Sequence, residues 1–529
     1  MAMMTRSNSL SGPGICGTDF TKYLGSGDRT RNMWKPLPRK PGRIGRRITL
    51  LAGVAVTCIC LLLVASSFSS NSSATSGWQL AVNIDDADGW CNDPCVTMNS
   101  TGHAMVAWEW HSATGTSTGV RVNSYAPETG WNAAELIQIN DTGYTVHPQV
   151  AMNDDGKAIL VWAHYDGTRS DICASSYSNG WGEAEVVQYG TVDSESLPWV
   201  DVEIDPNGNA IAVWHIKDGQ RNSIYGCRYV DGIGWEAPSL LEAGDGDAWA
   251  PQVAMDDSGD AVVVWFQFDY WEDVYACTYT VGVGWSTAEI IENDDSWSTF
   301  DPRVGVDSGG NAIAVWQQYV NSWSSVMANH YVKGVGWGTP VLIEANETGD
   351  AWSPEIAVND HGDAIVVWQN FFGNSVEDNW TDIWANRYVV GSGWQSEELI
   401  EDNNTLHGWI PRVAIDNDGN GIAVWMCEDN NVSAGIWSNR YFAGSGWGSP
   451  ERLSTADCSS SWGHQIAVND NGDATAVWCQ FDALGRHVWA NRYSELFIPE
   501  FSVTIAVAVS IAVMMALTRV VGKTGVKGN

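Results

Sequence analysis

Basic residues are scarce in this chain of 529 residues. It contains 27 Lys and Arg against 63 Asp and Glu, which gives a formal net charge of −36. Binding to nucleic acid requires a basic surface opposite the phosphates, so this charge argues against nucleic acid as a partner. Hydrophobic residues, in contrast, make up 44% of the chain and include 31 tryptophans. That composition excludes disorder along the whole length.

Common catalytic and metal-binding motifs are also missing. The chain has no HExxH sequence, no P-loop and no Cys/His pattern with metal-ligand spacing. We therefore predict no catalytic residue and no bound cofactor. Turns rich in Asp and Asn, such as residues 416–419 and 469–472, keep calcium binding as an alternative. They lack the distal glutamate and the number of ligands of an EF-hand, and a hairpin turn that ends in glycine explains them more simply.

Eight copies of one repeat occupy the middle of the chain. Each copy has an apolar segment that ends in Trp, then an apolar segment that ends in Tyr, and a Gly-Trp pair. Successive segment-ending tryptophans are 51 to 57 residues apart. These tryptophans are Trp108, Trp162, Trp214, Trp265, Trp316, Trp368, Trp425 and Trp478, and those of the Gly-Trp pairs are Trp78, Trp131, Trp181, Trp235, Trp285, Trp337, Trp394 and Trp447. Both sets are predicted to be packing residues.

One copy resolves into four short strands. In the copy around Trp265 the strands are expected at residues 251–256, 260–266, 274–279 and 285–291, separated by glycine-bearing turns or by a longer loop. No part of the repeat has a helical period. Four strands in about 50 residues, repeated in tandem, are typical of β-propeller blades.

The two ends of the array predict a closed ring. The first copy consists only of a fourth strand, at residues 77–84, and the last copy stops after its third strand, at residues 488–493. Together they make one whole blade. We therefore predict an all-β fold, an eight-bladed β-propeller closed by a 3+1 strand clasp, which leaves no open sheet edge.

Apolar runs at both ends predict two membrane segments. Residues 48–65 are apolar and uncharged and follow ten basic and two acidic residues in the first 47, while residues 503–517 precede a basic tail. The predicted organisation is a basic cytoplasmic tail (1–47), a transmembrane signal anchor (48–66), a Ser-rich linker (67–76), the propeller (77–497), a transmembrane or sorting segment (498–518) and a basic tail (519–529). The propeller would face the outside of the cell membrane. A cleaved signal peptide is the alternative for the first segment.

Two resemblances accompany this organisation. The pattern VA-x-[DN]-x-x-G-[DN]-A-x-x-VW followed by IWANRY-x-x-G-x-GW resembles uncharacterised extracellular β-propeller repeats of bacterial and archaeal surface proteins. That resemblance implies a surface location and no known activity. The sequence IPEF at 498–501, followed by an apolar span and a basic tail, resembles the PEF-type sorting tails of archaeal surface proteins. It implies that the tail is exchanged for a lipid anchor.

The predicted binding surface is the face onto which the longer loops open. The connections between second and third strands, and those that lead into the first strands, are long, variable and aromatic, and variable loops on a rigid scaffold commonly bind ligands. The candidate ligand-binding residues are Trp249, Trp297, Trp352, Trp409, Trp462, Trp271, Trp323 and Trp380. The simpler interpretation of the recurrent Trp-x-Pro is that its Trp packs on the adjacent blade.

These observations favour a non-catalytic binding or adhesion module whose partner is a glycan or another surface protein. A carbohydrate-active enzyme, with a pair of acids in the channel mouth, and a purely structural envelope protein are the alternatives. The Asp-rich turns also resemble the Asp-boxes of sialidases. However, Trp follows the turn glycine at +6 rather than +3, and the 14 basic residues between positions 71 and 497 are scattered, so sialidase activity is not expected.

The sequence also contains cysteines and glycosylation sequons in the predicted propeller. Eight cysteines in the propeller allow 105 pairings, so the sequence does not define the connectivity. Cys91 with Cys95 is locally feasible, Cys458 is expected near Cys427 and Cys479, and Cys227 and Cys277 are expected to be buried thiols. Seven Asn-x-Ser/Thr sequons fit an extracellular surface; they begin at Asn71, Asn99, Asn140, Asn346, Asn379, Asn403 and Asn431.

Overall fold

The computed structural model describes most of the repeat region. The described residues are 77–85, 89–114, 118–138, 143–191, 197–219, 221–269, 271–293, 298–320, 323–345, 349–372, 380–401, 407–429, 433–455, 460–482 and 485–494. The predicted membrane segments, the sorting tail and both basic tails lie outside them. Within the described ranges, no helix has the length and hydrophobicity needed to cross a membrane.

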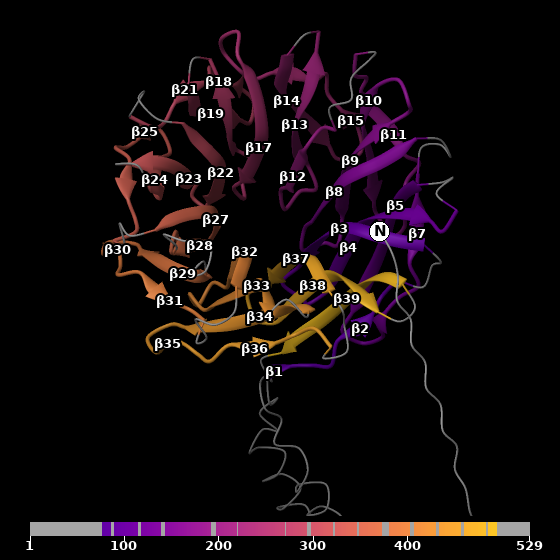
Figure 1. Ribbon diagram of the computed structural model, residues 1–529. Coiled ribbons are helices and arrows are strands. Elements are labelled where there is room, and N and C mark those ends of the chain that lie inside the picture. The colour runs from indigo at the N-terminus through magenta and orange to yellow at the C-terminus, as the bar shows by residue number, and fades with distance from the viewer. Residues whose placement is uncertain are drawn as a thin grey trace, which may run out of the picture. The chain divides into compact units, whose positions relative to one another are not determined.

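Eight antiparallel sheets, which we call blades, make up the described structure (Figure 1). The innermost strand of each blade contacts the innermost strands of the two neighbouring blades in a closed cycle. The inner strands are β3 (Gly89–Met98), β8 (Tyr144–Met152), β12 (Val200–Ile204), β17 (Asp247–Met255), β22 (Thr299–Val306), β27 (Asp350–Val358), β32 (His407–Ile415) and β37 (Ser460–Val468). The predicted eight-bladed propeller is therefore confirmed.

The second and third strands of each blade form a long hairpin. The second strands are β4 (Ala104–Ser112), β9 (Ala158–Tyr165), β13 (Ala210–Asp218), β18 (Ala261–Phe268), β23 (Ala312–Val320), β28 (Ala364–Phe372), β33 (Gly421–Asp429) and β38 (Ala474–Asp482). The third strands are β5 (Thr118–Ala126), β10 (Ser170–Tyr177), β14 (Arg221–Val230), β19 (Glu272–Thr280), β24 (Trp323–Val332), β29 (Trp380–Val389), β34 (Ser433–Phe442) and β39 (Gly485–Ser494).

The outer strand differs from the prediction because a bulge divides it. In the fourth blade, Trp285 pairs with Tyr279 and Ile290 pairs with Tyr275, so the outer strand carries one extra residue between these pairs. The outer pieces are β6 (Gly130–Trp131) and β7 (Glu135–Ile137), β11 (Glu185–Gln188), β15 (Gly234–Trp235) and β16 (Ser239–Leu240), β20 (Gly284–Trp285) and β21 (Glu289–Ile290), β25 (Gly336–Trp337) and β26 (Val341–Leu342), β30 (Gly393–Trp394) and β31 (Glu398–Leu399), and β35 (Gly446–Trp447) and β36 (Glu451–Arg452).

The eighth blade contains strands from both ends of the repeat region. β1 (Gly77–Trp78) and β2 (Val82–Asn83) pair with β39, with Trp78 opposite Tyr493 and Val82 opposite Ala490. The Trp78 and Tyr493 rings meet edge to face at 5.7 Å. The predicted 3+1 clasp is therefore confirmed.

Both sets of repeated tryptophans pack as predicted. In the described blades, each segment-ending Trp of the second strand is at most 1% exposed. Each Gly-Trp tryptophan is half-buried and lies 5.1 to 5.7 Å from the Tyr of its third strand. Such aromatic pairs stabilise beyond the apolar area that they bury.

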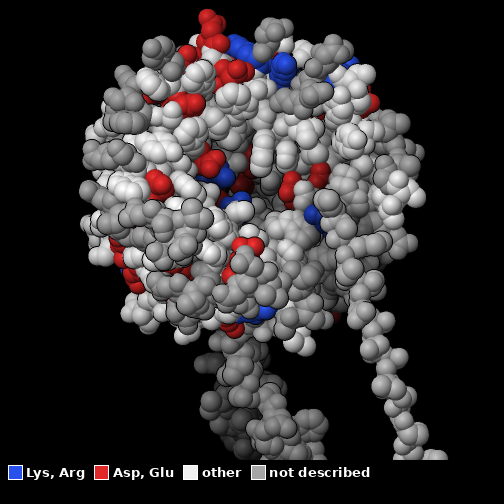
Figure 2. Space-filling view, viewed as in Figure 1, with Lys and Arg blue, Asp and Glu red and all other residues white. Residues whose placement is uncertain are grey.

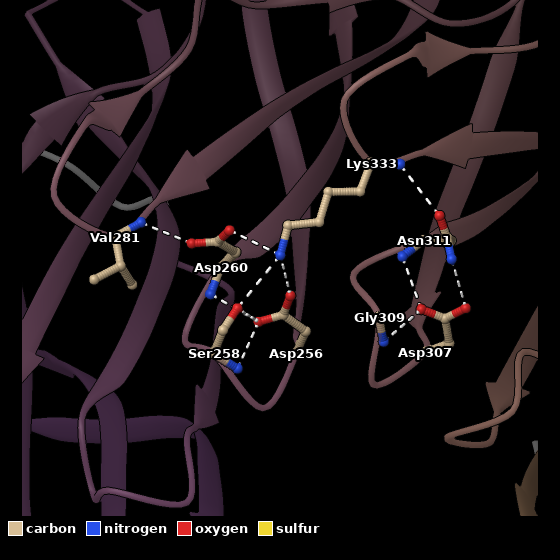
Figure 3. Close-up of polar contacts among 8 residues, drawn as sticks. All are labelled: Asp256, Ser258, Asp260, Val281, Asp307, Gly309, Asn311 and Lys333. Atoms are coloured by element: carbon tan, nitrogen blue, oxygen red, sulfur yellow. Dashed lines mark hydrogen bonds and ion pairs between the residues drawn. The ribbon is translucent and has the colours of Figure 1, made fainter.

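Hydrogen bonds within the chain account for the Asp- and Asn-rich turns (Figure 3). The Asp256 carboxylate accepts bonds from the backbone N–H groups of Ser258 and Asp260, both at 2.9 Å. Gly259 closes the hairpin at φ +83°, and the Lys333 ammonium of the next blade lies 2.6 Å from Asp256. No group of three or more His, Cys, Asp or Glu side chains in the described ranges is placed to hold a metal ion.

Candidate functional site

A bulge near the start of each long inner strand shapes the mouth of the central channel. In β17, Trp249 pairs with Phe266 and Gln252 pairs with Val264, so one extra residue is inserted. The residue after the Trp position adopts a left-handed conformation, which is uncommon outside glycine. We call these residues the mouth positions; they are Asp93, His147, Ala250, Asp301, Ser353, Ile410 and Gly463, with φ between 43° and 61°.

The mouth residues of the first two blades contact each other, and Trp199, which precedes β12 of the third blade, contacts the second of them. His147 Nε2 lies 3.7 Å from the Asp93 carboxylate, and its ring stacks on Trp199 with centroids 4.3 Å apart and planes 16° apart. The other nitrogen, His147 Nδ1, lies 3.0 Å from the Pro198 carbonyl. Trp199 is 57% exposed. These contacts support one face of an exposed aromatic ring.

Sequence reasoning missed Trp199 because its blade departs from the repeat. Four other inner strands carry Trp-x-Pro or its variant, whereas here the order is Pro198-Trp199. The exchange moves the Trp to the place in the sequence where the other blades have their mouth residue, although the Trp199 backbone is not left-handed. That transposed pair is the pattern in the sequence that could have identified it.

The predicted tryptophans of the inner strands lie one residue before the mouth positions and are half-buried. Trp352 stacks on Phe371 at 5.5 Å, and Trp462 Nε1 donates to Asn92 Oδ1 of the adjacent blade at 3.1 Å. Trp249 and Trp409 occupy the equivalent positions. These contacts agree with the packing interpretation and leave the proposed binding role untested.

The remaining predicted tryptophans are spread over the loop connections. Trp271 is 43% exposed and Trp380 is 36% exposed. Trp323 begins β24 and is half-buried. Trp297 lies outside the described residues. Trp249 contacts Phe266 and Trp409 contacts His407, each within its own blade.

Charged residues form the floor beneath the mouth. The first inner-strand residue after the bulge is charged in four blades: Asp201, Arg303, Glu355 and Arg412. Arg303 Nε and an Arg412 terminal nitrogen both lie 3.2 Å from the same Glu355 oxygen. Figure 2 shows acidic and basic side chains together in the hollow at the centre of the ring. The expectation that the basic residues are scattered is wrong here, because blades five and seven place two arginines on one carboxylate.

Two acids in the third blade have strongly raised pKa values. Burial raises the pKa of Asp201 to about 7, although its carboxylate accepts a 2.9 Å bond from the backbone of Val253. Enclosure by the channel wall raises the pKa of Glu203 to about 8, and the Asp201 charge adds to this. Part of the Glu203 side chain is exposed at the surface, and the equivalent residues of the next two blades, Ala254 and Gly305, are small and uncharged.

The mouth itself contains a third perturbed acid. Burial and the nearby Glu109 charge raise the pKa of Asp93, while His147 opposes the rise. His215 lies behind Trp199, with Nδ1 3.3 Å from the Trp199 backbone nitrogen. Burial lowers the pKa of His215 to about 3, so its ring is neutral at physiological pH.

Acids also gather at the far end of the channel. There Asn417 Nδ2 donates to Asp360 and Asp470 at 2.7 and 2.8 Å. Burial raises the pKa values of Asp257 and Asp470, and the charges of Asp360 and Asp154 raise them further. The far end of the channel therefore carries mutually repelling carboxylates, whereas the loop face combines an exposed aromatic ring with both charge signs.

Replacing Glu203 with glutamine is expected to reduce the loss of stability at alkaline pH. A carboxyl whose folded pKa lies above its unfolded value stabilises the fold below about pH 4 and loses that contribution as pH rises through the folded pKa. Thermal unfolding between pH 5 and 9 should show Glu203→Gln more stable than the wild type at pH 9 by on the order of 1 kcal/mol, after allowance for screening by water. The same change at exposed Glu135 is the control. An identical pH profile for wild type and Glu203→Gln would contradict the enclosure of the Glu203 carboxyl by the channel wall.

The sequon at Asn99 does not fit a glycosylated surface. Asn99 is 5% exposed, and its side-chain oxygen accepts the backbone N–H of His103 at 3.0 Å. The Asn99 side chain closes the hairpin turn of the first blade with the same backbone hydrogen bond that Asp256 makes in the fourth blade. The other six sequons lie outside the described residues.

No protein-family model matches the chain, and no curated protein matches it either. Solved structures with a similar arrangement include a protein of unknown function from Dyadobacter fermentans, with 11% identity over 79% of this chain and 99% of that chain, at a TM-score of 0.41. The polysaccharide lyase Uly1 has 9% identity over the same shares, at a TM-score of 0.48. An α-L-arabinanase from Penicillium chrysogenum has 11% identity over 56% of this chain and 92% of that chain, at a TM-score of 0.37.

Proposed function

We propose that this protein is a surface propeller that binds glycans at the mouth of its central channel. The proposal rests on the row of three side chains in contact at the channel mouth, Asp93, His147 and Trp199. The flat face of an indole stacks well on the C–H face of a sugar ring, and a carboxylate and an imidazole beside it suit sugar hydroxyls. Because Trp199 is held by its stack on His147, little entropy is lost when a ligand binds.

The charge of the molecule favours neutral sugars. The two channel arginines already contact Glu355, and residues 71–497 carry a net charge of −46. Long anionic chains would be repelled by such a surface. We propose that the terminal apolar segments, 48–66 and 498–518, hold the propeller outside the cell membrane, in agreement with the expectation from the sequence.

A glycan array tests the proposal. The full-length protein is expected to retain neutral oligosaccharides, both with and without calcium. Trp199→Ala should lose roughly five-fold or more in retention, because stacking on an aromatic ring contributes about 1 kcal/mol. Trp271→Ala and Trp380→Ala report on the candidates predicted from sequence. An array without any bound glycan would contradict the proposal and would favour a surface-protein partner or an envelope role.

A carbohydrate-active enzyme is the second candidate. Asp93 favours it, since burial and the Glu109 charge raise the pKa of its carboxyl, which lies 3.7 Å from His147 Nε2 at the channel mouth. If the protein cleaves its ligand, incubation with an array-selected oligosaccharide should release new chain ends, and Asp93→Asn should stop the release. If the protein retains the oligosaccharide without cleaving it, the result supports binding without catalysis.

A further inference from the structure

Two cysteines face each other where the ring closes. Cys91 lies on β3 of the first blade and Cys479 on β38 of the eighth, and the two sulfur atoms are 2.9 Å apart. Both residues are fully buried, at 0% exposure. They belong to one apolar cluster that spans the seam between these blades and includes Trp108 and Val488.

We propose that Cys91 and Cys479 form a disulfide bond that locks the ring covalently. The sulfurs lie only about 0.9 Å beyond the length of such a bond. The two residues are 388 positions apart in sequence, so the bond would join the first blade to the last. It would cross the interface between blades eight and one, whereas the clasp joins β1 and β2 to β39 within blade eight.

The local pairing considered from the sequence fits the structure less well. Cys95 Sγ donates to the carbonyl of Ala107 at 3.5 Å, and Cys95 sits beyond the bulge, at the floor position of its strand. The alternative partner for Cys479, Cys458, lies outside the described residues. The experiment below distinguishes these pairings.

Formation of the bond requires an oxidant, for which we take a disulfide-containing compound such as oxidised glutathione. The two thiols lose two protons and two electrons, the sulfur–sulfur bond forms, and the oxidant is reduced to two thiols. Because neither sulfur is reachable from solvent in the closed ring, the exchange takes place while the seam is open, during folding or during local opening. The finished bond is shielded from reductants by the same packing.

Peptide mapping of the full-length protein tests the bond. The protein is purified without reductant, exposed to oxidised glutathione during refolding, then denatured, alkylated and digested. The expected product is a cross-linked peptide pair containing Cys91 and Cys479, about 2 Da lighter than the two reduced peptides together and lost on reduction. Cys173 and Cys277 should be alkylated in the same sample, because neither has a cysteine partner among the described residues.

Two further measurements make the result decisive. Reduction of the bond is expected to lower the melting temperature by roughly 5 °C, because it releases a very long loop in the unfolded chain. Dithiothreitol should reduce the bond slowly in the native protein and rapidly in urea. Complete alkylation of Cys91 and Cys479 after oxidation, or a cross-link from either of them to Cys95 or Cys458, would overturn the proposal.

Discussion

Replacing Glu355 with alanine should lower the free energy of unfolding by about 3 kcal/mol. The carboxylate contacts both channel arginines, and all three side chains are only about a fifth exposed. Without it, Arg303 and Arg412 remain close together without their shared counter-ion. Burial already lowers the pKa of Arg412, and the charge of Arg303 lowers it further, against the opposing effect of Glu355. The loss is measured by urea denaturation of both proteins, provided that their free energies of unfolding depend equally on urea concentration.

Asp231→Ala provides the matched control for this prediction. Asp231 forms an ion pair of 2.8 Å with Lys157, but their side chains are 41% and 31% exposed. Exposed pairs contribute at most about 1 kcal/mol. A triple replacement, Arg303→Met with Glu355→Leu and Arg412→Met, should recover most of the stability lost by Glu355→Ala. Equal losses for Glu355→Ala and Asp231→Ala would show that channel water screens the cluster as well as bulk solvent does.

Replacing Trp78 with alanine is expected to open the eighth blade. Trp78 provides the ring contact with Tyr493, and the clasp strands that hold it to β39 contain only two residues each. The expected loss is about 4 kcal/mol, roughly half of it from the Trp itself. The remainder comes from the pairings of β1 and β2 with β39, which are lost together when the clasp opens.

Trp131→Ala isolates the part due to ring closure. Trp131 makes the same contact with Tyr125 at 5.4 Å, but its blade is built from continuous chain. Its loss should be about 2 kcal/mol and should leave a single unfolding transition. Trp78→Ala should in addition make the eighth blade exchange its amide hydrogens faster than the fourth. Equal stability losses and uniform exchange in the two variants would contradict a closing role for β1 and β2.

The repeat made most of the fold predictable. Four-strand periodicity, buried Trp at the end of the second strand and split end copies are all local patterns, and they correctly predicted eight blades and the clasp. The bulges in the inner and outer strands were not predicted, because a bulge depends on the pairing between strands rather than on one strand's residue types.

The candidate site was harder to predict for the same reason. Sequence repetition drew attention to the recurrent Trp of Trp-x-Pro, whereas the row at the mouth depends on departures from the repeat, such as Trp199 and Glu203. Arg303 and Arg412 are 109 positions apart in the sequence, and only the ring places both on Glu355. A residue that breaks the repeat in one blade carried more information about the site than residues that recur in every blade.

Calorimetric titration of the full-length protein with the neutral oligosaccharide selected on the array tests the central proposal most directly. Trp199→Ala should weaken binding roughly five-fold or more and change the melting temperature only slightly, because the side chain is 57% exposed. Trp462→Ala should lower the melting temperature instead, since its indole bonds to the adjacent blade. Undiminished affinity in Trp199→Ala would contradict a glycan site at the channel mouth.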